Sequence, residues 1–179
     1  MSNRSLLRRM LRAARIESQF YEEVEAEPQS IAQAFVVVLL ACLAGSLGSW
    51  LASRPPLVVA TDLLEPLVLW LAGGVFTYMV GATFLRGPHT VTSYAEVLRT
   101  TGFAWSPGLL RFAVVIPYGP VGLGLTIAGD LWVLVAGIVA LRQALDFTTL
   151  RAVGTFGVSW ALLWLTFEGL LLGLTSLLW

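Results

Sequence analysis

The sequence predicts an all-α membrane protein in which five transmembrane helices form a bundle behind an amphipathic N-terminal arm. Of its 179 residues, 57% are hydrophobic and only 12% are charged, whereas soluble domains carry about 25% charged residues. The apolar residues also form long continuous runs, and a bilayer core of about 30 Å needs about 20 such residues per helix. Continuous runs favour helices over a β-barrel, whose strands alternate in hydropathy.

Five runs are apolar enough to cross a bilayer, and little chain remains between them. The predicted spans are residues 31–53, 63–85, 102–118, 121–141 and 154–178. The other residues are too scattered to build a second soluble domain. We therefore expect residues 1–30 to form a cytoplasmic amphipathic arm with an acidic collar, and residues 31–179 to form the transmembrane domain.

The third run is short and contains Pro107, Arg111 and Pro117, which leaves two arrangements open. In the first, this run crosses the membrane and forms a tight hairpin with the fourth run through Gly119 and Pro120. In the second, the run is re-entrant and only four helices cross.

Arginine is distributed unevenly along the chain, and this distribution predicts the orientation. With the N-terminus inside, nine Arg residues lie on the inner side of the predicted spans and only Arg54 lies on the outer side. Because cytoplasmic flanks of membrane helices carry the positive charge, we predict a cytoplasmic N-terminus.

The arm has the pattern of a helix that lies on a membrane surface. At about 100° per residue, a helix over residues 4–24 has an apolar side and a basic side. The basic side is formed by Arg4, Arg8, Arg9, Arg12 and Arg15. Ile16 and Glu17 do not fit the pattern. We expect this arm to bind anionic lipids, where each Arg contributes up to about 1 kcal/mol. The alternative is that the arm packs on the loops and reinforces the topology.

Three charged residues fall deep inside the predicted spans, namely Arg111, Asp130 and Glu168. The helical rise of about 1.5 Å per residue brings all three close to one layer in the middle of the membrane. A charge at this depth costs several kcal/mol unless it is paired or hydrated. The cluster is therefore either a structural pairing of Arg111 with the acids or a polar cavity for a proton, an ion or a lipid headgroup.

Small residues four positions apart predict faces at which helices approach closely. These faces contain Ala41 with Gly45, Gly73 with Thr77 and Gly81, and Gly169 with Gly173. They serve either packing within the bundle or self-association.

Signatures of enzymes and of metal sites are incomplete. Asp130 lacks the first Gly of the Gly-x-Gly-Asp motif of intramembrane aspartyl hydrolases, and the segment around Ser159 lacks the last Gly of a nucleophile elbow. The single His89 has no second His or thiol nearby, and the single Cys42 has no partner for a disulfide. We therefore predict a non-enzymatic protein with no cofactor, no metal and no nucleic-acid partner.

Three stretches in order resemble the Yip (Ypt-interacting protein) domain family of small polytopic membrane proteins. They are residues 20–28 (FYEEVEAEP), 94–107 (YAEVLRTTGFAWSP) and 141–152 (LRQALDFTTLRA). The resemblance covers most of residues 20–178 and implies five transmembrane helices with a cytoplasmic N-terminus. Eukaryotic members are associated with small prenylated GTPases and with traffic between ER and Golgi, but their Asp-Leu-Tyr-Gly-Pro motif is missing here.

The short arm and the exclusive use of Arg as the basic residue resemble a prokaryotic member of this family. We expect an inner-membrane protein of Yip type that scaffolds or organises membrane components, as an accessory subunit or a homo-oligomer. The alternatives are a channel or carrier that uses the layer of Arg111, Asp130 and Glu168, and a protein that handles lipids.

Overall fold

The computed structural model is helical throughout the residues that it describes, with no strand among them. It describes residues 5–86, 92–117 and 119–178, with side chains described as far as residue 167. The helices are α1 (Leu6–Ala14), α2 (Ser18–Glu25), α3 (Ser30–Leu51), α4 (Pro56–Met79), the π-helix η1 (Val80–Phe84), α5 (Tyr94–Ala104), the 3₁₀ helix η2 (Ser106–Val115), α6 (Gly119–Ala144) and α7 (Thr149–Leu178). The prediction of an all-α chain is confirmed.

Four helices are long and apolar enough to cross a bilayer, as expected of an integral membrane protein. They are α3, α4 with η1 (Pro56–Phe84), α6, and α7 as far as Phe167. The second of these spans begins at Pro56, seven residues before the predicted start at residue 63. A proline suits this position because the first turn of a helix does not use its N–H groups.

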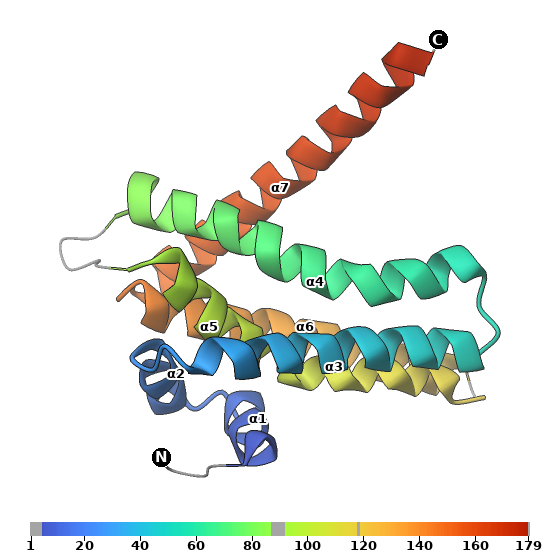
Figure 1. Cartoon of the computed structure of the whole chain (residues 1–179), viewed down its shortest axis with the longest axis horizontal. Coiled ribbons are helices and arrows are strands. Elements are labelled where there is room, and N and C mark those ends of the chain that lie inside the picture. Colours follow the sequence, from blue (N-terminus) through green and yellow to red (C-terminus); the bar gives the residue numbers. More distant parts are fainter. Residues whose placement is uncertain (1–4, 87–91, 118, 179) are drawn as a thin grey trace.

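The third predicted span, residues 102–118, is not one continuous helix, so the prediction of five spans is not confirmed. α5 ends at Ala104, and after Trp105 the chain continues as η2, a 3₁₀ helix of ten residues. Pro107 has no N–H and therefore cannot make the α-helical hydrogen bond at this point. α5 and η2 nevertheless follow one another along α3 (Figure 1).

The arm consists of two helices, whereas the sequence pattern predicted a single helix over residues 4–24. α1 ends at Ala14 and α2 begins at Ser18. Between them Ile16 has a φ of 59°, which a β-branched residue rarely adopts. The break coincides with the two residues that did not fit the periodicity, and it folds α2 back beside α1.

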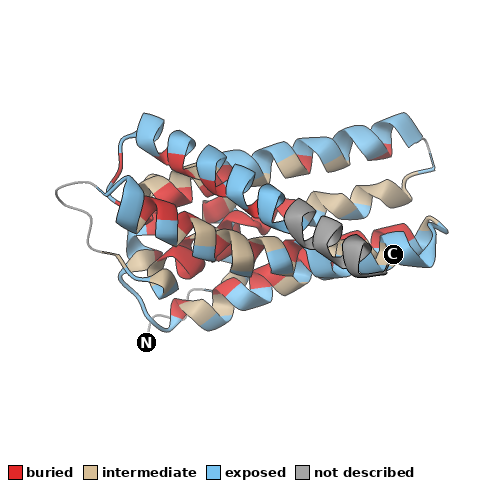
Figure 2. Ribbon diagram, turned by 90° about the horizontal axis from the view of Figure 1, so that it is seen from above, coloured by how far each residue is buried: buried red, intermediate tan, exposed pale blue. Residues whose placement is uncertain are grey.

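The arm packs on the bundle and contributes to its core. Phe20 and Tyr21 of α2 are almost fully buried, and the ring of Phe20 lies edge-on to that of Phe103 in α5 at 5.2 Å. Figure 2 shows the buried residues gathered where the helices face one another, while the outward faces are exposed. We call the end of the bundle near α2 the arm end and the opposite end the hairpin end.

Hydrogen bonds tie the arm to parts of the chain that are distant in sequence. Trp132 Nε1, halfway along α6, donates to the carbonyl oxygen of Ala14 at 2.8 Å. At the end of α6, Arg142 Nη2 donates to Ser18 Oγ at 2.9 Å. The arm is therefore anchored to α6 at two points along that helix.

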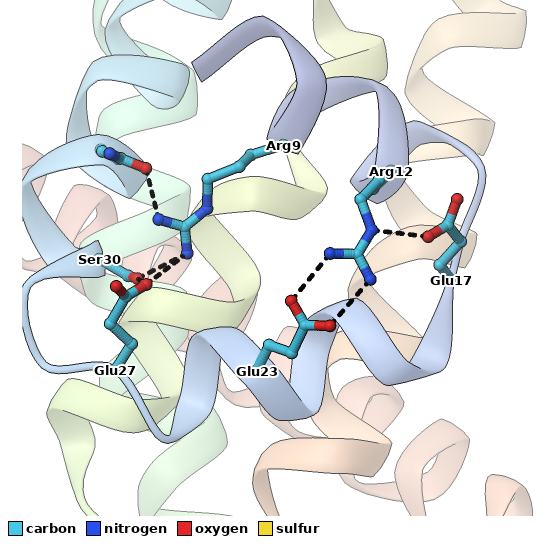
Figure 3. Close-up of polar contacts among 7 residues, drawn as sticks. Arg9, Arg12, Glu17, Glu23, Glu27 and Ser30 are labelled. Carbon is cyan, nitrogen blue, oxygen red and sulfur yellow. Dashed lines mark hydrogen bonds and ion pairs between the residues drawn. The ribbon is translucent and has the colours of Figure 1, made fainter. Parts of the chain in front are cut away.

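Arg9 points into the fold and is buried, whereas the sequence pattern placed it on the basic side of a membrane-surface arm (Figure 3). Its guanidinium donates to Gln33 Oε1 at 2.6 Å, to Ser30 Oγ at 2.7 Å and to Glu27 Oε2 at 2.9 Å. It also lies 5.0 Å from the ring centroid of Phe103. These contacts fix α1 against the start of α3.

Arg12 is likewise engaged within the arm, because the break at Ile16 brings acidic residues of α2 towards α1. It donates to Glu17 Oε2 at 2.8 Å and to both carboxylate oxygens of Glu23 at 2.8 and 3.1 Å. These hydrogen bonds raise the pKa of Arg12 above its usual value. Only Arg8 and Arg15 of the predicted basic side are exposed, and Arg4 lies outside the described residues.

Replacement of Arg9 by Leu removes three hydrogen bonds that hold α1 to the bundle. We expect the free energy of unfolding to fall by about 2 kcal/mol and the arm to become more sensitive to protease. Thermal unfolding and limited proteolysis in mild detergent measure both effects. The matched control is Arg8→Leu, which alters an exposed neighbour and should change little; equal stability of the two variants would show that Arg9 does not anchor the arm.

Candidate functional site

A charged cluster is centred on Arg111 of η2, which is largely buried and pairs with two half-exposed carboxylates from neighbouring helices. Arg111 Nε donates to Asp130 Oδ1 of α6 at 2.7 Å, and Nη1 donates to Glu65 Oε2 of α4 at 3.1 Å. The Arg111 side chain is 11% exposed, and its guanidinium lies 5.7 Å from the ring of Trp105. One cation thus holds two carboxylates from different helices.

The cluster lies close to the middle of the membrane-spanning part of the bundle. Glu65 is about 14 Å along α4 from Pro56, and Asp130 is about 16 Å along α6 from Gly119. Half of a bilayer core is about 15 Å. An ion pair at this depth marks a functional site unless it serves only to hold the helices together.

Irregular backbone surrounds the cluster on two sides. Pro66 follows Glu65 directly and has no N–H, so α4 lacks the hydrogen bond to the carbonyl of Asp62. On the other side, Arg111 lies in the ten-residue 3₁₀ helix η2, which is longer than such helices usually are. Irregular backbone at membrane depth is tolerated where it is buried in protein or lines a cavity.

The structure brings together two of the three intramembrane charges that the sequence singled out, Arg111 and Asp130. The side chain of the third, Glu168, lies outside the described residues. Glu65 was missed because the predicted span began at residue 63, which put Glu65 at the membrane border. The adjacent Pro55 and Pro56 were the signal that could have found it, since they start the helix a full two turns earlier.

A cavity of about 360 Å³ lies beside the cluster, between α4, α5, α6 and α7. Its wall is mostly apolar and aromatic, and Glu65, Arg111 and Asp130 form its charged part. Among its lining residues, Leu131 and Trp160 are more than half exposed. The cavity therefore opens sideways, on the surface that faces lipid in a membrane helix bundle.

One polar group in this wall has no partner. Ser159 of α7 is only 3% exposed, and its hydroxyl makes no hydrogen bond to any described residue. Buried hydroxyls are nearly always hydrogen-bonded. A polar atom of a ligand in the cavity would supply the missing bond.

A second cavity, of about 330 Å³, lies on the other side of the cluster towards the hairpin end. Ser49, Arg54 and Asp62 contribute to its wall, and Ser49 Oγ donates a short hydrogen bond to Asp62 Oδ2. Glu65, Arg111 and Asp130 line both cavities. The charged cluster is thus the boundary between an apolar space and a polar one.

The predicted small-residue faces have different surroundings. Gly45 lies inside, where an added Cβ would be 3.7 Å from Arg111 Cβ, and Ala41 is fully buried. Gly81 packs tightly against Leu145, whereas an added Cβ at Gly73 would meet nothing within 4 Å.

Gly73 and Thr77 of the same face line the larger cavity. Gly169 and Gly173 lie outside the residues whose side chains are described.

A second group of charges lies at the arm end. Arg99 of α5 is 6% exposed, and its Nη2 donates to the carbonyl oxygen of Glu25 at 2.6 Å. Burial, together with the nearby carboxylates of Asp146 and Glu96, raises the pKa of Glu25 to about 7, while Arg99 opposes this rise. Glu22 adds a further negative charge nearby. This group stabilises the arm end most when Glu25 is protonated.

The described residues contain no group of three His, Cys, Asp or Glu side chains that could hold a metal ion. His89 lies outside them. The Arg111 cluster and its two cavities are therefore the candidate site, and the chemistry they offer is the binding of a charged or polar group beside an apolar chain.

Replacement of Arg111 by Met leaves two carboxylates at membrane depth without their cation. We expect the free energy of unfolding to fall by about 3 kcal/mol, with a loss of folded protein in detergent. The triple variant Arg111→Met, Glu65→Gln, Asp130→Asn removes all the charges together and should recover most of that loss. A triple variant no better folded than the single one would contradict this account of the pairing.

Protonation of Glu25 should make stability depend on pH. Because its pKa rises from 4.5 unfolded to about 7 folded, the folded state binds the proton more tightly, and stability is lost as pH increases from about 4.5 to about 7. Thermal unfolding between pH 5 and pH 8 measures this slope. Glu25→Gln should flatten it and be more stable than the wild type at pH 8, and an unchanged slope would assign the titration to another group.

Comparison with known proteins returns no relative. No protein-family model matches the chain, and no curated protein or solved structure does so either. A function for this chain has to be argued from the geometry of the Arg111 cluster and the two cavities.

Proposed function

We propose that this chain is a non-enzymatic integral membrane protein that binds a membrane amphiphile, a lipid or a lipid-like molecule, in the two adjoining cavities. The observation that carries the proposal is the apolar cavity of about 360 Å³ that ends at a charged cluster in the middle of the bundle. Small-molecule sites are typically about 300–1,000 Å³, mostly apolar, with a few well-placed polar groups. An amphiphile matches both halves of this site.

Access from the bilayer supports the same proposal. The exposed Leu131 and Trp160 at the wall of the cavity give an apolar chain a route that never enters water. The buried hydroxyl of Ser159 offers a hydrogen bond to a polar atom of the amphiphile. An interrupted helix beside a mid-membrane site, as formed here by α5 and η2, is also a feature of secondary transporters, so a carrier for such a molecule is the form of the function that we favour.

The topology that we propose has a cytoplasmic N-terminus in the inner membrane of a prokaryote. Arg9, Arg99 and Arg142 gather at the arm end, whereas Arg54 lies at the hairpin end, and positive charge favours the cytoplasmic side. α5 covers about 16 Å and η2 about 20 Å. Together they are long enough for a broken fifth crossing, in agreement with the resemblance to the Yip family.

A second candidate function is a self-associating scaffold of the Yip type. It is favoured by an open small-residue face on α7, where Cβ atoms added to Gly154 or Gly157 would meet nothing within 4 Å. The exposed Arg8 and Arg15 would bind anionic lipids at the same membrane surface. A strictly monomeric protein in lipid nanodiscs would count against this candidate.

A side chain that fills the larger cavity should displace the amphiphile. Gly73 lines the cavity and has free space beyond its Cα, so Gly73→Phe should place its ring there without a clash. Native mass spectrometry from mild detergent counts the lipids that remain bound to each variant. We expect about a tenfold loss of occupancy relative to the wild type.

The matched control for this experiment is Gly124→Phe on α6. Gly124 is exposed, has nothing within 4 Å of an added Cβ, and does not line the larger cavity. This variant should retain the lipid. Equal occupancy in the wild type and Gly73→Phe would remove the basis of the proposal.

A further inference from the structure

The two cavities differ in polarity and meet at the Arg111 cluster. The lining of the larger one is mainly apolar, whereas seven of the ten residues that line the smaller one are polar or charged. A single amphiphile that occupied both would have its chain in the larger cavity and its headgroup in the smaller one. The charge of the smaller cavity therefore decides which headgroup is bound.

The smaller cavity carries more negative than positive charge. Its wall contains three carboxylates and two guanidiniums, those of Asp62, Glu65, Asp130, Arg54 and Arg111. Arg111 is already engaged with two of the acids. Asp62 accepts a hydrogen bond from the hydroxyl of Ser49 and forms no ion pair with any described residue.

A carboxylate at this position needs a counter-ion. Asp62 is about 9 Å along α4 from Pro56, and a charge inside the bilayer core costs several kcal/mol unless it is compensated. Arg54 is exposed at the mouth of the cavity. A ligand with a positive charge would neutralise Asp62, whereas an anionic headgroup would have to approach three carboxylates.

The chemistry of the wall favours an ammonium group over a metal ion. No group of three metal-ligating side chains is formed by the described residues. A protonated primary amine has three N–H donors and no acceptor. The carboxylates of Asp62 and Glu65 and the hydroxyl oxygen of Ser49 offer an acceptor for each of these donors. In the wall of the larger cavity, the buried hydroxyl of Ser159 makes no hydrogen bond to any described residue, as is also true of Thr155 one turn earlier on α7.

We propose that the two adjoining cavities select an amphiphile whose headgroup is a protonated primary amine, with the ammonium at Asp62 and Glu65. This inference rests on the proposed function, because an amphiphile must first bind there. The ammonium belongs either to a lipid headgroup, as in phosphatidylethanolamine, or to a free alkylamine.

The test compares three decyl compounds that differ only in charge. The full chain in phosphatidylcholine nanodiscs is titrated with decylammonium, decanesulfonate or decanol, and the Tm is followed, since a ligand that binds only the folded state raises it. We expect decylammonium to bind about tenfold more tightly than decanesulfonate. Replacement of phosphatidylcholine by phosphatidylethanolamine should weaken decylammonium binding if the lipid headgroup is the native source, and leave it unchanged if a free amine is.

Variants in the same nanodiscs separate the site from general partition into the bilayer. Asp62→Asn should remove the preference for decylammonium, and Glu65→Gln serves the same purpose if Asp62→Asn does not fold. The control is Asp146→Asn, which removes one carboxylate at the arm end and should keep the preference. Asp146 has a φ of 52°, which Asn tolerates well.

Two negative results are distinguishable. Equal binding of the three compounds, or tighter binding of decanesulfonate, would overturn the ammonium headgroup and leave the proposed function standing. No binding of any compound, together with unchanged lipid occupancy in Gly73→Phe, would overturn the proposed function itself.

Discussion

The constraint on which the structure depends is the cost of a guanidinium and its carboxylates at membrane depth. Arg111 can be held there only if acids reach it from neighbouring helices, and both Glu65 and Asp130 do so. Three elements are arranged around this need. η2 carries the cation, α4 contributes Glu65 beside the missing hydrogen bond at Pro66, and α6 contributes Asp130.

The elements that could be predicted from the sequence are those with one physical solution. A run of about 20 apolar residues has to be a helix if it crosses a bilayer, and α3, α6 and α7 follow directly. The ends of the helices were harder to predict, because a proline can either begin a helix or interrupt one, and the sequence pattern does not say which. The interruption between α5 and η2 depends on how Pro107 packs against the neighbouring helices, and the periodicity of the sequence carries no information about that packing.

The candidate site could likewise be predicted only in part. Arg111 and Asp130 could be assigned to one layer because both are counted from the same short turn at Gly119, and helical rise is constant. The two cavities could not be predicted, since their volumes depend on how α7 and the other helices pack together. Arg9 and Arg12 were assigned to a surface because the periodicity was that of one straight helix. The turn at Ile16 reverses the chain instead, and that reversal requires an uncommon backbone conformation.

The hydrogen bonds that join the arm to α6 impose an order on biogenesis. α1 and α2 leave the ribosome before α6, and their partners Trp132 and Arg142 are synthesised more than a hundred residues after them. Translation proceeds at about 5–20 residues per second, so Phe20 and Tyr21 wait for several seconds before their final contacts exist. The N-terminal segment therefore takes its final position only after the α6 residues that hold it have been synthesised.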